Sequence, residues 1–198
     1  EEAVAILKKN GISQSRIVYY DETKNWWSRA GTKEKMPVGE PGGPDSEIFY
    51  EFTEVEHDQK FGDKCHPNCD CGRFMEIGNS VFMTYQKTDS GFIPLAKKNI
   101  DFGGGLERMT SAVNNDPDIF KTSLYSGIIS QIEKFSGRSY AALENRSLMR
   151  IVADHLKASV FLIADGVRPS NKAQGYFLRR LLRRAMVKMQ ELNGDLTS

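Results

Sequence analysis

The chain has 198 residues, of which 39% are hydrophobic and 27% are charged, so it can build a hydrophobic core and is not a disordered tail. Its 27 basic and 26 acidic residues give a formal net charge of +1, which taken alone argues against a nucleic-acid-binding protein. No apolar run approaches the roughly 20 residues of a membrane span, and no signal peptide is recognisable, so we expect no membrane contact. Three cysteines fit no closed disulfide framework, which predicts a reduced, cytoplasmic setting.

The charge is unevenly distributed along the chain. Residues 146–190 carry ten basic and two acidic side chains, a net charge of +8, so the rest of the chain carries −7. The value near zero therefore averages two oppositely charged parts, and it does not exclude a nucleic-acid partner for the basic part. Because the chain begins with Glu1 and not with Met, we also expect it to be a piece of a longer protein.

The first part of the chain is predicted to be mainly extended. Hydrophobic spacing and turn residues predict a helix at 3–9, strands at 16–20 and 48–52, a polar loop rich in Gly and Pro at 21–45, and a loop with all three cysteines that ends at Gly72. A long, mostly buried strand follows at 73–85, broken near Gly78 and Asn79, and a shorter strand lies at 92–95.

The second part is predicted to be helical. Apolar residues recur at three- and four-residue steps in three segments: a helix capped by Asp116 that runs to Phe135, a helix opened by Ser147, and a helix at 175–192. Strands followed by helices are the α+β order. We place the domain boundary after residue 140, which gives domains 1–140 and 141–198.

Residues 101–108 combine a strand end, three consecutive glycines and a helix start. Glycines let a ligand approach the backbone, and the N–H groups of a helix start attract anions. Asp101 is placed to hold an ammonium group, and Arg108 is placed to stack on or pair with a nucleotide. The alternative is a tight structural turn with a solvated Arg108, because isolated glycine clusters are weak signals.

Four arginines crowd one stretch of the last predicted helix. They form two i,i+4 pairs on adjacent rows, and no acidic residue occurs between Asp165 and Glu191. Like charges at this spacing repel each other unless a polyanion neutralises them, so the pattern favours contact with a phosphate backbone over an ordinary solvated face. The four residues are Arg179, Arg180, Arg183 and Arg184.

All three cysteines lie within seven residues, at Cys65, Cys69 and Cys71, with His66 between them and His57 eight positions before the first. Thiolates and imidazoles are the tetrahedral ligands of zinc, and free cysteines are usually buried singly. The spacing therefore favours a Zn²⁺ site with one of the two histidines as a ligand. It is not a standard C-x2-C knuckle, so a loop of free thiols is the alternative.

Several stretches in order over nearly the whole chain resemble the catalytic domain of the alanyl-tRNA synthetases. They are Trp27 with 41–50, and then 74–83, 101–109, 151–155, 161–171 and 175–184. The resemblance implies a class II synthetase fold, in which an antiparallel sheet with flanking helices is followed by a helical segment that recognises tRNA. It also implies an ATP-dependent, Mg²⁺-dependent ligase that activates L-alanine and transfers it to alanine tRNA.

The resemblance further implies roles for single residues. Residues 101–109 resemble the third signature motif of the class, so Gly103, Gly105 and Arg108 are implied to bind ATP. Asp101 is similar to the carboxylate that binds the alanine ammonium. The walls of the small alanine pocket are implied to be Trp27, Asn79, Val81 and Gly103. Asn171 resembles the residue that reads the G·U pair of the acceptor stem, beside which the arginines would lie.

The sequence departs from the family at three positions. Gly78 stands where Trp is usual, and Phe102 and Gly104 stand where Thr and Met are common. The cysteine loop is not general in the family either. The resemblance implies that the first two signature motifs precede residue 1, so the chain alone is expected to be inactive and to need the N-terminal half of the enzyme as a partner. The alternative is a non-catalytic, synthetase-like RNA-binding module with a zinc-stabilised loop.

Overall fold

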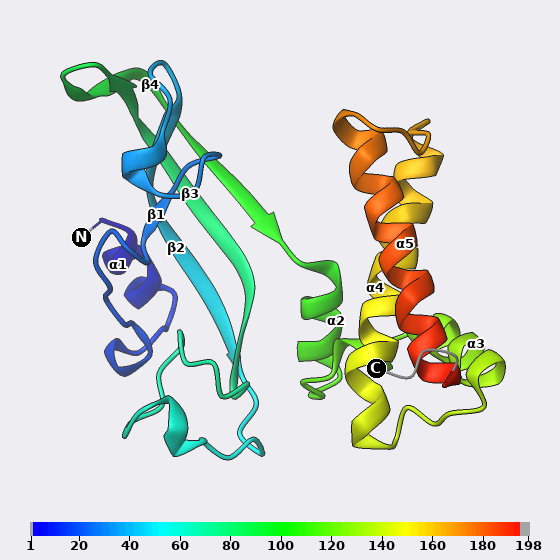
Figure 1. The fold of residues 1–198 in the computed structure, drawn as a ribbon. Helices are drawn as coiled ribbons and strands as arrows, with labels where there is room; N and C mark the ends of the chain where they lie inside the picture. The colour runs from blue at the N-terminus through cyan, green and yellow to red at the C-terminus, as the bar shows by residue number, and fades with distance from the viewer. Residues whose placement is uncertain (1, 195–198) are drawn as a thin grey trace. The chain divides into compact units, whose positions relative to one another are not determined.

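The computed structural model describes residues 2–194, which form two compact units (Figure 1). The first extends to Pro117 and contains the sheet, and the second begins at Asp118 and is helical. The fold class is α+β, as predicted. The contacts divide the chain before the boundary that we placed after residue 140, and the two units are described separately. No helix among the described residues is long and apolar enough to cross a membrane.

The first unit is built on a four-stranded sheet in the order β1-β2-β3-β4, and every neighbouring pair is antiparallel. The chain therefore folds back on itself at each turn without a crossover connection. Helix α1 precedes the sheet and α2 follows it. The bounds are α1 Glu2–Lys9, β1 Trp26–Trp27, β2 Pro41–Glu51, β3 Phe74–Thr88, β4 Gly91–Gly104 and α2 Leu106–Val113.

Two predictions for the first segments are wrong. Residues 16–20 form no strand: Gln14–Arg16 is a short 3₁₀ turn, and Val18 and Tyr19 are exposed, so β-propensity without a pairing partner did not make a strand. The predicted loop at 21–45 contains β1 and the start of β2. Its glycines are needed there, because a Cβ on Gly43 would overlap the carbonyl oxygen of Phe82 on the neighbouring strand.

The long strand and its partner are more continuous than predicted. β3 is one mostly half-buried strand from Phe74 to Thr88, and the predicted break near Gly78 corresponds only to a shift of its register with β2, in which Ile77 has no partner. The predicted 92–95 strand is part of the longer β4. A glycine is needed at position 78 because the Phe102 ring of β4 lies against it: a Cβ there would be 2.8 Å from the ring. Likewise, a Cβ on Gly104 would overlap the side chain of Met109. The departures from the family at Gly78 and Phe102 are thus sterically complementary.

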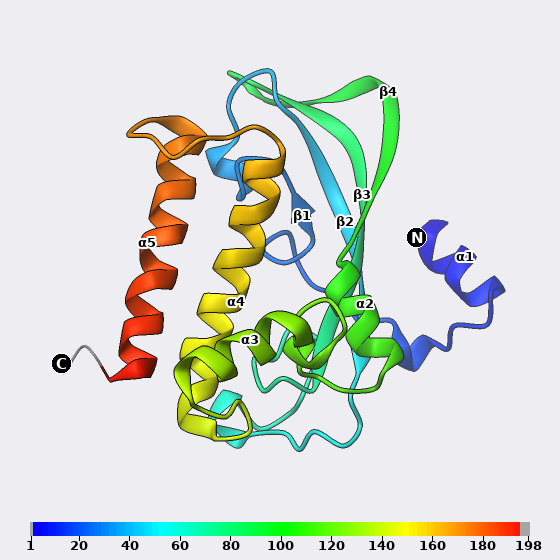
Figure 2. The same ribbon diagram turned by 90° about the vertical axis from the view of Figure 1, so that its right-hand side faces the viewer.

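The second unit packs three helices, α3 (Ser126–Ser136), α4 (Leu143–Ala164) and α5 (Ala173–Asn193), with α4 and α5 side by side (Figures 1 and 2). Its core joins all three: buried Ile129 and Ile132 pack with Met149 and Val152 of α4 and with Leu192 of α5. The burial of α3 in this core explains why the second unit begins at Asp118 and not after residue 140.

The helix predicted to be capped by Asp116 begins later than expected. Asp118 caps a 3₁₀ turn at Ile119–Lys121, and α3 starts only at Ser126. The Asp118 carboxylate also accepts hydrogen bonds from the Tyr140 hydroxyl at 2.8 and 2.9 Å and from the Arg150 guanidinium at 2.9 Å. This network ties the turn to α4. Helices α4 and α5 begin a few residues before the predicted starts.

Candidate active site

The functional side chains predicted for the first unit come from different strands but share one face of the sheet. In an antiparallel sheet, directly paired residues project from the same face, as do residues two apart on one strand. Asp45 of β2 pairs with Val81 of β3, which pairs in turn with Asp101 of β4. One step along, the row is Glu47, Asn79 and Gly103. Register and pleat alone therefore gather these six residues.

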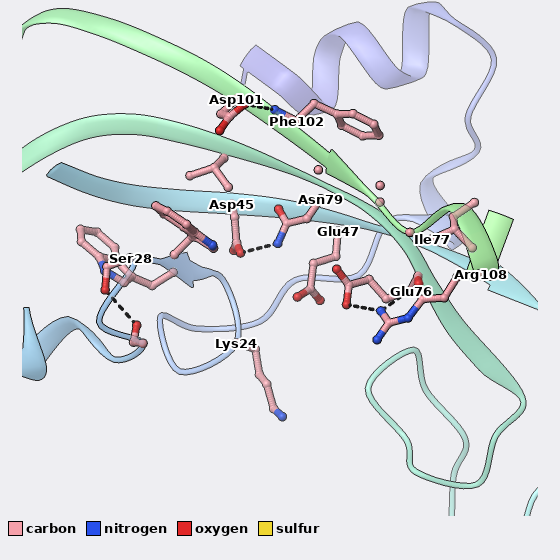
Figure 3. A pocket seen from close by; sticks show the side chains of 18 residues that line it. Lys24, Ser28, Asp45, Glu47, Glu76, Ile77, Asn79, Asp101, Phe102 and Arg108 are labelled. Carbon is pink, nitrogen blue, oxygen red and sulfur yellow. Dashed lines mark hydrogen bonds and ion pairs between the residues drawn. The ribbon is translucent and has the colours of Figure 1, made fainter. Parts of the chain in front are cut away.

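This face forms the wall of a pocket of about 610 Å³ (Figure 3). The two tryptophans of β1 and the start of α2 also line the pocket. The volume is in the range of sites for drug-sized ligands and cofactors. The charged groups of the lining are four carboxylates and two cations. They are Asp45, Glu47, Glu76, Asp101, Lys24 and Arg108.

Asp45 and Asn79 point toward one another in the pocket wall, and the Asn79 amide donates a 2.8 Å hydrogen bond to the Asp45 carboxylate (Figure 3). The remaining oxygen of each side chain is buried and has no hydrogen-bond partner among the described residues. Buried polar atoms are rarely left without a partner, because the loss of hydration is costly. These two oxygens are therefore suited to accept hydrogen bonds from a bound ligand.

Arg108 is the third residue of α2, whose N-cap is Gly105. Its guanidinium donates 3.0 and 3.1 Å hydrogen bonds to the side chain and the backbone carbonyl of Glu76 (Figure 3). The Arg108 side chain is 50% exposed, so the guanidinium is held in position while part of it remains available to a ligand. Asp101 is exposed, and its carboxylate accepts a 2.9 Å hydrogen bond from the N–H of Phe102.

The neighbours of Glu47 in the pocket wall affect its ionisation. Burial, and then the negative charges of Glu76 and Asp45, raise the pKa of Glu47 above its ordinary value of 4.5. The charged form of Glu47 is therefore disfavoured in the folded chain, which is typical of carboxylates held for a cationic ligand or a proton.

We expect Glu47→Gln to raise the melting temperature at pH 7. Because the pKa of Glu47 is higher in the folded than in the unfolded chain, its ionisation costs stability above pH 4.5, and the amide removes that cost. Below pH 4.5 both states bind the proton and the gain should disappear. Thermal unfolding at several pH values measures this, with exposed Glu56→Gln as the control. A variant that melts below the wild type at pH 7 would contradict the prediction.

The structure brings together every residue predicted to bind alanine or ATP: Trp27, Asn79, Val81, Asp101, Gly103, Gly105 and Arg108 all line the pocket. Sequence reasoning missed Asp45, Glu47 and Glu76 as parts of it. The alternation of Asp45 and Glu47 along β2 is a signal that could have found two of them, but only the strand register shows that they face Asn79 and Val81.

The four predicted arginines are exposed along α5, while Leu178 and Ala185 of the same helix are buried. Asn171 accepts a hydrogen bond from the Arg179 guanidinium, so these two predicted tRNA-binding residues adjoin. Within residues 2–194, no carboxylate lies within ion-pair distance of the four guanidiniums. Met186 of the same helix is 59% exposed.

The predicted metal ligands also come together, outside the pocket. The three thiols cluster with His57, whereas His66 makes a 3.0 Å contact with the Tyr20 hydroxyl instead. His57 and the backbone N–H of Arg73 lower the pKa of Cys71 to about 6. Burial and the adjacent Cys71 raise the pKa of Cys65 to about 11.

Comparison with known proteins gives similar chains that are named alanine–tRNA ligases. The chain is 37% identical to the enzyme of Treponema denticola over 98% of the chain and 32% of the relative. It is 41% identical to that of Desulfosudis oleivorans over 94% of the chain and 20% of the relative. For Petrotoga mobilis the identity is 39%, over 94% of the chain and 21% of the relative. The chain thus spans between a fifth and a third of the length of these curated relatives.

The model of the family described as tRNA synthetases class II (A) matches residues 1–197. The match includes the strands that form the pocket, residues 101–109 and the arginine-rich helix. The antiparallel sheet, whose last strand ends in glycines and leads into α2, agrees with the fold that the resemblance implied. The chain belongs to the class II (A) tRNA synthetase family.

Proposed function

We propose that the protein of which this chain is part is an alanine–tRNA ligase, and that the pocket in the first unit binds L-alanine and ATP. The observation that carries the proposal is the convergence of the predicted residues. Trp27, Asn79, Asp101 and Arg108 come from β1, β3, β4 and α2, and all of them line one pocket. The relatives that match this chain are named for the same activity.

The alanine end of the pocket is the part between β1 and the paired strands. Asp101 would bind the ammonium group of the amino acid, and the free oxygens of Asp45 and Asn79 offer further acceptors nearby. Trp27 and Val81 supply the apolar surface for the methyl group. Carboxylates outnumber cations around this pocket, which favours a ligand with a positive group on that side.

ATP would bind toward the start of α2. Gly103 and Gly105 allow the nucleotide to approach the backbone, the helix start favours its negative charge, and Arg108 would pair with a phosphate. Carboxylates are the ligands that Mg²⁺ prefers, so Glu47 and Glu76 fit the Mg²⁺ that accompanies ATP and offsets phosphate charge. We assign no step to Zn²⁺, because none of its predicted ligands lines the pocket.

The reaction has two steps. In the first, an oxygen of the alanine carboxylate attacks the α-phosphorus of ATP, and the bond to the β-phosphate oxygen breaks, giving alanyl-adenylate and pyrophosphate. In the second, a hydroxyl of the tRNA terminal adenosine attacks the alanyl carbonyl carbon and AMP leaves. The residues here act by holding the reactants in line and neutralising charge, without a covalent enzyme intermediate.

Alanine-dependent exchange of labelled pyrophosphate into ATP by the full-length protein tests the first step. We expect exchange with alanine, and much less with glycine or serine. A protein that binds tRNA but catalyses no exchange would reject the ligase and favour the non-catalytic RNA-binding module. The same assay on residues 1–198 alone, with and without the remainder of the protein, tests the predicted need for an N-terminal partner. A cytoplasmic location stays a prediction.

The second unit would bind the acceptor stem of alanine tRNA through α5. Four exposed guanidiniums without ion-pair partners in the described chain offer charge to phosphates, and Asn171, held by Arg179, would read the G·U pair. Arginine contacts to phosphates position the RNA, whereas a contact to base edges discriminates. The two kinds of residue should therefore respond differently to substitution.

Replacing Arg180 and Arg184 by Gln should weaken binding of every acceptor stem about equally and reduce the slope of log K against log salt by roughly 2, one for each phosphate contact. Asn171→Ala should instead abolish the preference for a G·U stem over a G·C stem. Titration of stem duplexes at several salt concentrations measures both. Lys134→Gln, on the exposed surface of α3, is the control. An unchanged salt slope would contradict the arginine prediction.

A further inference from the structure

The loop between β2 and β3 contains a compact group of four side chains that the proposed ligase reaction does not use. The Sγ atoms of Cys65, Cys69 and Cys71 and a ring nitrogen of His57 all lie within 4.8 Å of one another. The loop begins after Phe52 and ends at Arg73, at the lower end of the sheet in Figure 1.

The spacing of these atoms is that of a tetrahedral metal site. Zn–S bonds of about 2.3 Å and Zn–N bonds of about 2.0 Å place neighbouring ligand atoms of a tetrahedron roughly 3.5–3.8 Å apart. The Sγ atoms of Cys65 and Cys71 are 3.5 Å apart, and Sγ of Cys69 lies 3.7 Å from Nδ1 of His57. These two distances match a tetrahedron, and because all four atoms lie within 4.8 Å of one another, only a small contraction of the loop would close them around a single ion.

The orientation of His57 supplies an independent observation. Its Nε2 lies 2.8 Å from the carbonyl oxygen of Gly62, and since a carbonyl only accepts, Nε2 must carry the proton. The lone pair of the neutral ring is then on Nδ1, the atom that faces the thiols. A ligand histidine typically donates its other N–H to a carbonyl or carboxylate in this way, which fixes its tautomer and orientation.

The loop itself needs such an anchor. Between residues 53 and 73, Cys69 is the one buried residue, and the single regular element is a 3₁₀ turn at Gln59–Phe61. The ends of the loop are tied by the Phe52 N–H to Arg73 carbonyl bond at 2.8 Å and by the Arg73–Glu51 ion pair at 2.8 Å. A loop of this length without a core is uncommon unless something else orders it.

We propose that this loop binds one structural Zn²⁺ ion through His57, Cys65, Cys69 and Cys71. Three soft thiolates and one imidazole select Zn²⁺ over Mg²⁺ or Ca²⁺, and a Cys₃His set is a known structural type. Four protein ligands close the coordination sphere and leave no position for a reacting water. The ion orders the connection between β2 and β3, the two strands that carry Asp45, Glu47 and Asn79 of the pocket.

The test is metal analysis of the full-length protein, purified in zinc-containing medium without chelators. The wild type is compared with His57→Ala, Cys69→Ser and the control His66→Ala. We expect His57→Ala and Cys69→Ser to contain one equivalent of zinc fewer than the wild type, and His66→Ala to contain the same amount. Comparing equivalents in this way keeps the result independent of metal sites elsewhere in the protein. When Zn²⁺ is replaced by Co²⁺, the wild type and His66→Ala should show the visible absorption bands of a tetrahedral thiolate site. His57→Ala should lack them.

Limited trypsin digestion supplies a second readout. Lys60 and Lys64 are exposed in the loop, so cleavage there reports on its order. Cleavage should be at least about tenfold faster in His57→Ala, or after removal of zinc, than in the wild type or His66→Ala. Equal zinc content in wild type and Cys69→Ser, loss of zinc in His66→Ala, bound iron, or a Cys65–Cys71 disulfide in the freshly purified protein would each overturn the proposal.

Discussion

Replacing Asp101 by Asn should lower kcat/KM for alanine in pyrophosphate exchange by about 100-fold or more. A hydrogen bond between charged groups contributes up to about 3 kcal/mol, and each 1.4 kcal/mol is a factor of ten. Asp101 shares its face of the sheet with Val81, and the amide keeps its size but removes the negative charge that an ammonium needs. The loss should appear mainly in KM for alanine, with KM for ATP little changed.

The matched control is Asp89→Asn, an identical chemical change on the exposed turn between β3 and β4. It should exchange pyrophosphate like the wild type. If Asp101→Asn retains full exchange, Asp101 does not bind the ammonium, and Asp45→Asn becomes the informative variant, because the Asp45 carboxylate lines the same pocket. Comparing the thermal unfolding of Asp101→Asn with that of the wild type separates a lost contact from a damaged fold.

Adding one methyl group should strongly lower the stability at one strand glycine and leave it nearly unchanged at another. Gly43→Ala should destabilise the sheet unit by about 3 kcal/mol, because the new Cβ would overlap the Phe82 carbonyl of the neighbouring strand, which cannot move as a side chain can. Gly103→Ala should change stability by less than about 0.5 kcal/mol, because nothing lies within 4 Å of its Cβ position.

The same two variants separate an effect on folding from an effect on ligand binding. The methyl group of Gly103→Ala projects from the pocket face, where one extra carbon in a small site reduces binding by roughly 10- to 200-fold. Its exchange activity should therefore fall while its melting temperature stays the same. Denaturant unfolding and exchange assays on both variants check this. Loss of stability in Gly103→Ala, or a fully stable Gly43→Ala, would contradict the packing at the corresponding glycine.

Local sequence patterns predicted the elements that are determined by residues close together in the sequence. The helices of the second unit follow from three- and four-residue apolar spacing. The helix start at Leu106 also follows from the sequence, but Gly103 and Gly104 belong to β4, and only Gly105 connects the strand to α2. The arginines on α5 are exposed as their spacing indicated, since the apolar residues of the same helix, such as Leu178, determine which face is buried. In these segments the interactions lie between residues close in sequence, so periodicity is sufficient.

The sequence by itself thus determined the α+β class, the family resemblance, the residue types of the pocket and the cluster of thiols. Only the tertiary structure decided which carboxylates join Asp101 in the pocket, which histidine faces the cysteines, and why Gly78 and Gly43 lie inside strands. The physical reason is that each of these depends on strand register or on a close approach between segments distant in sequence. A shift of one residue in β2 would turn Asp45 and Glu47 to the other face, and which register forms depends on pairing with β3, which is distant in sequence.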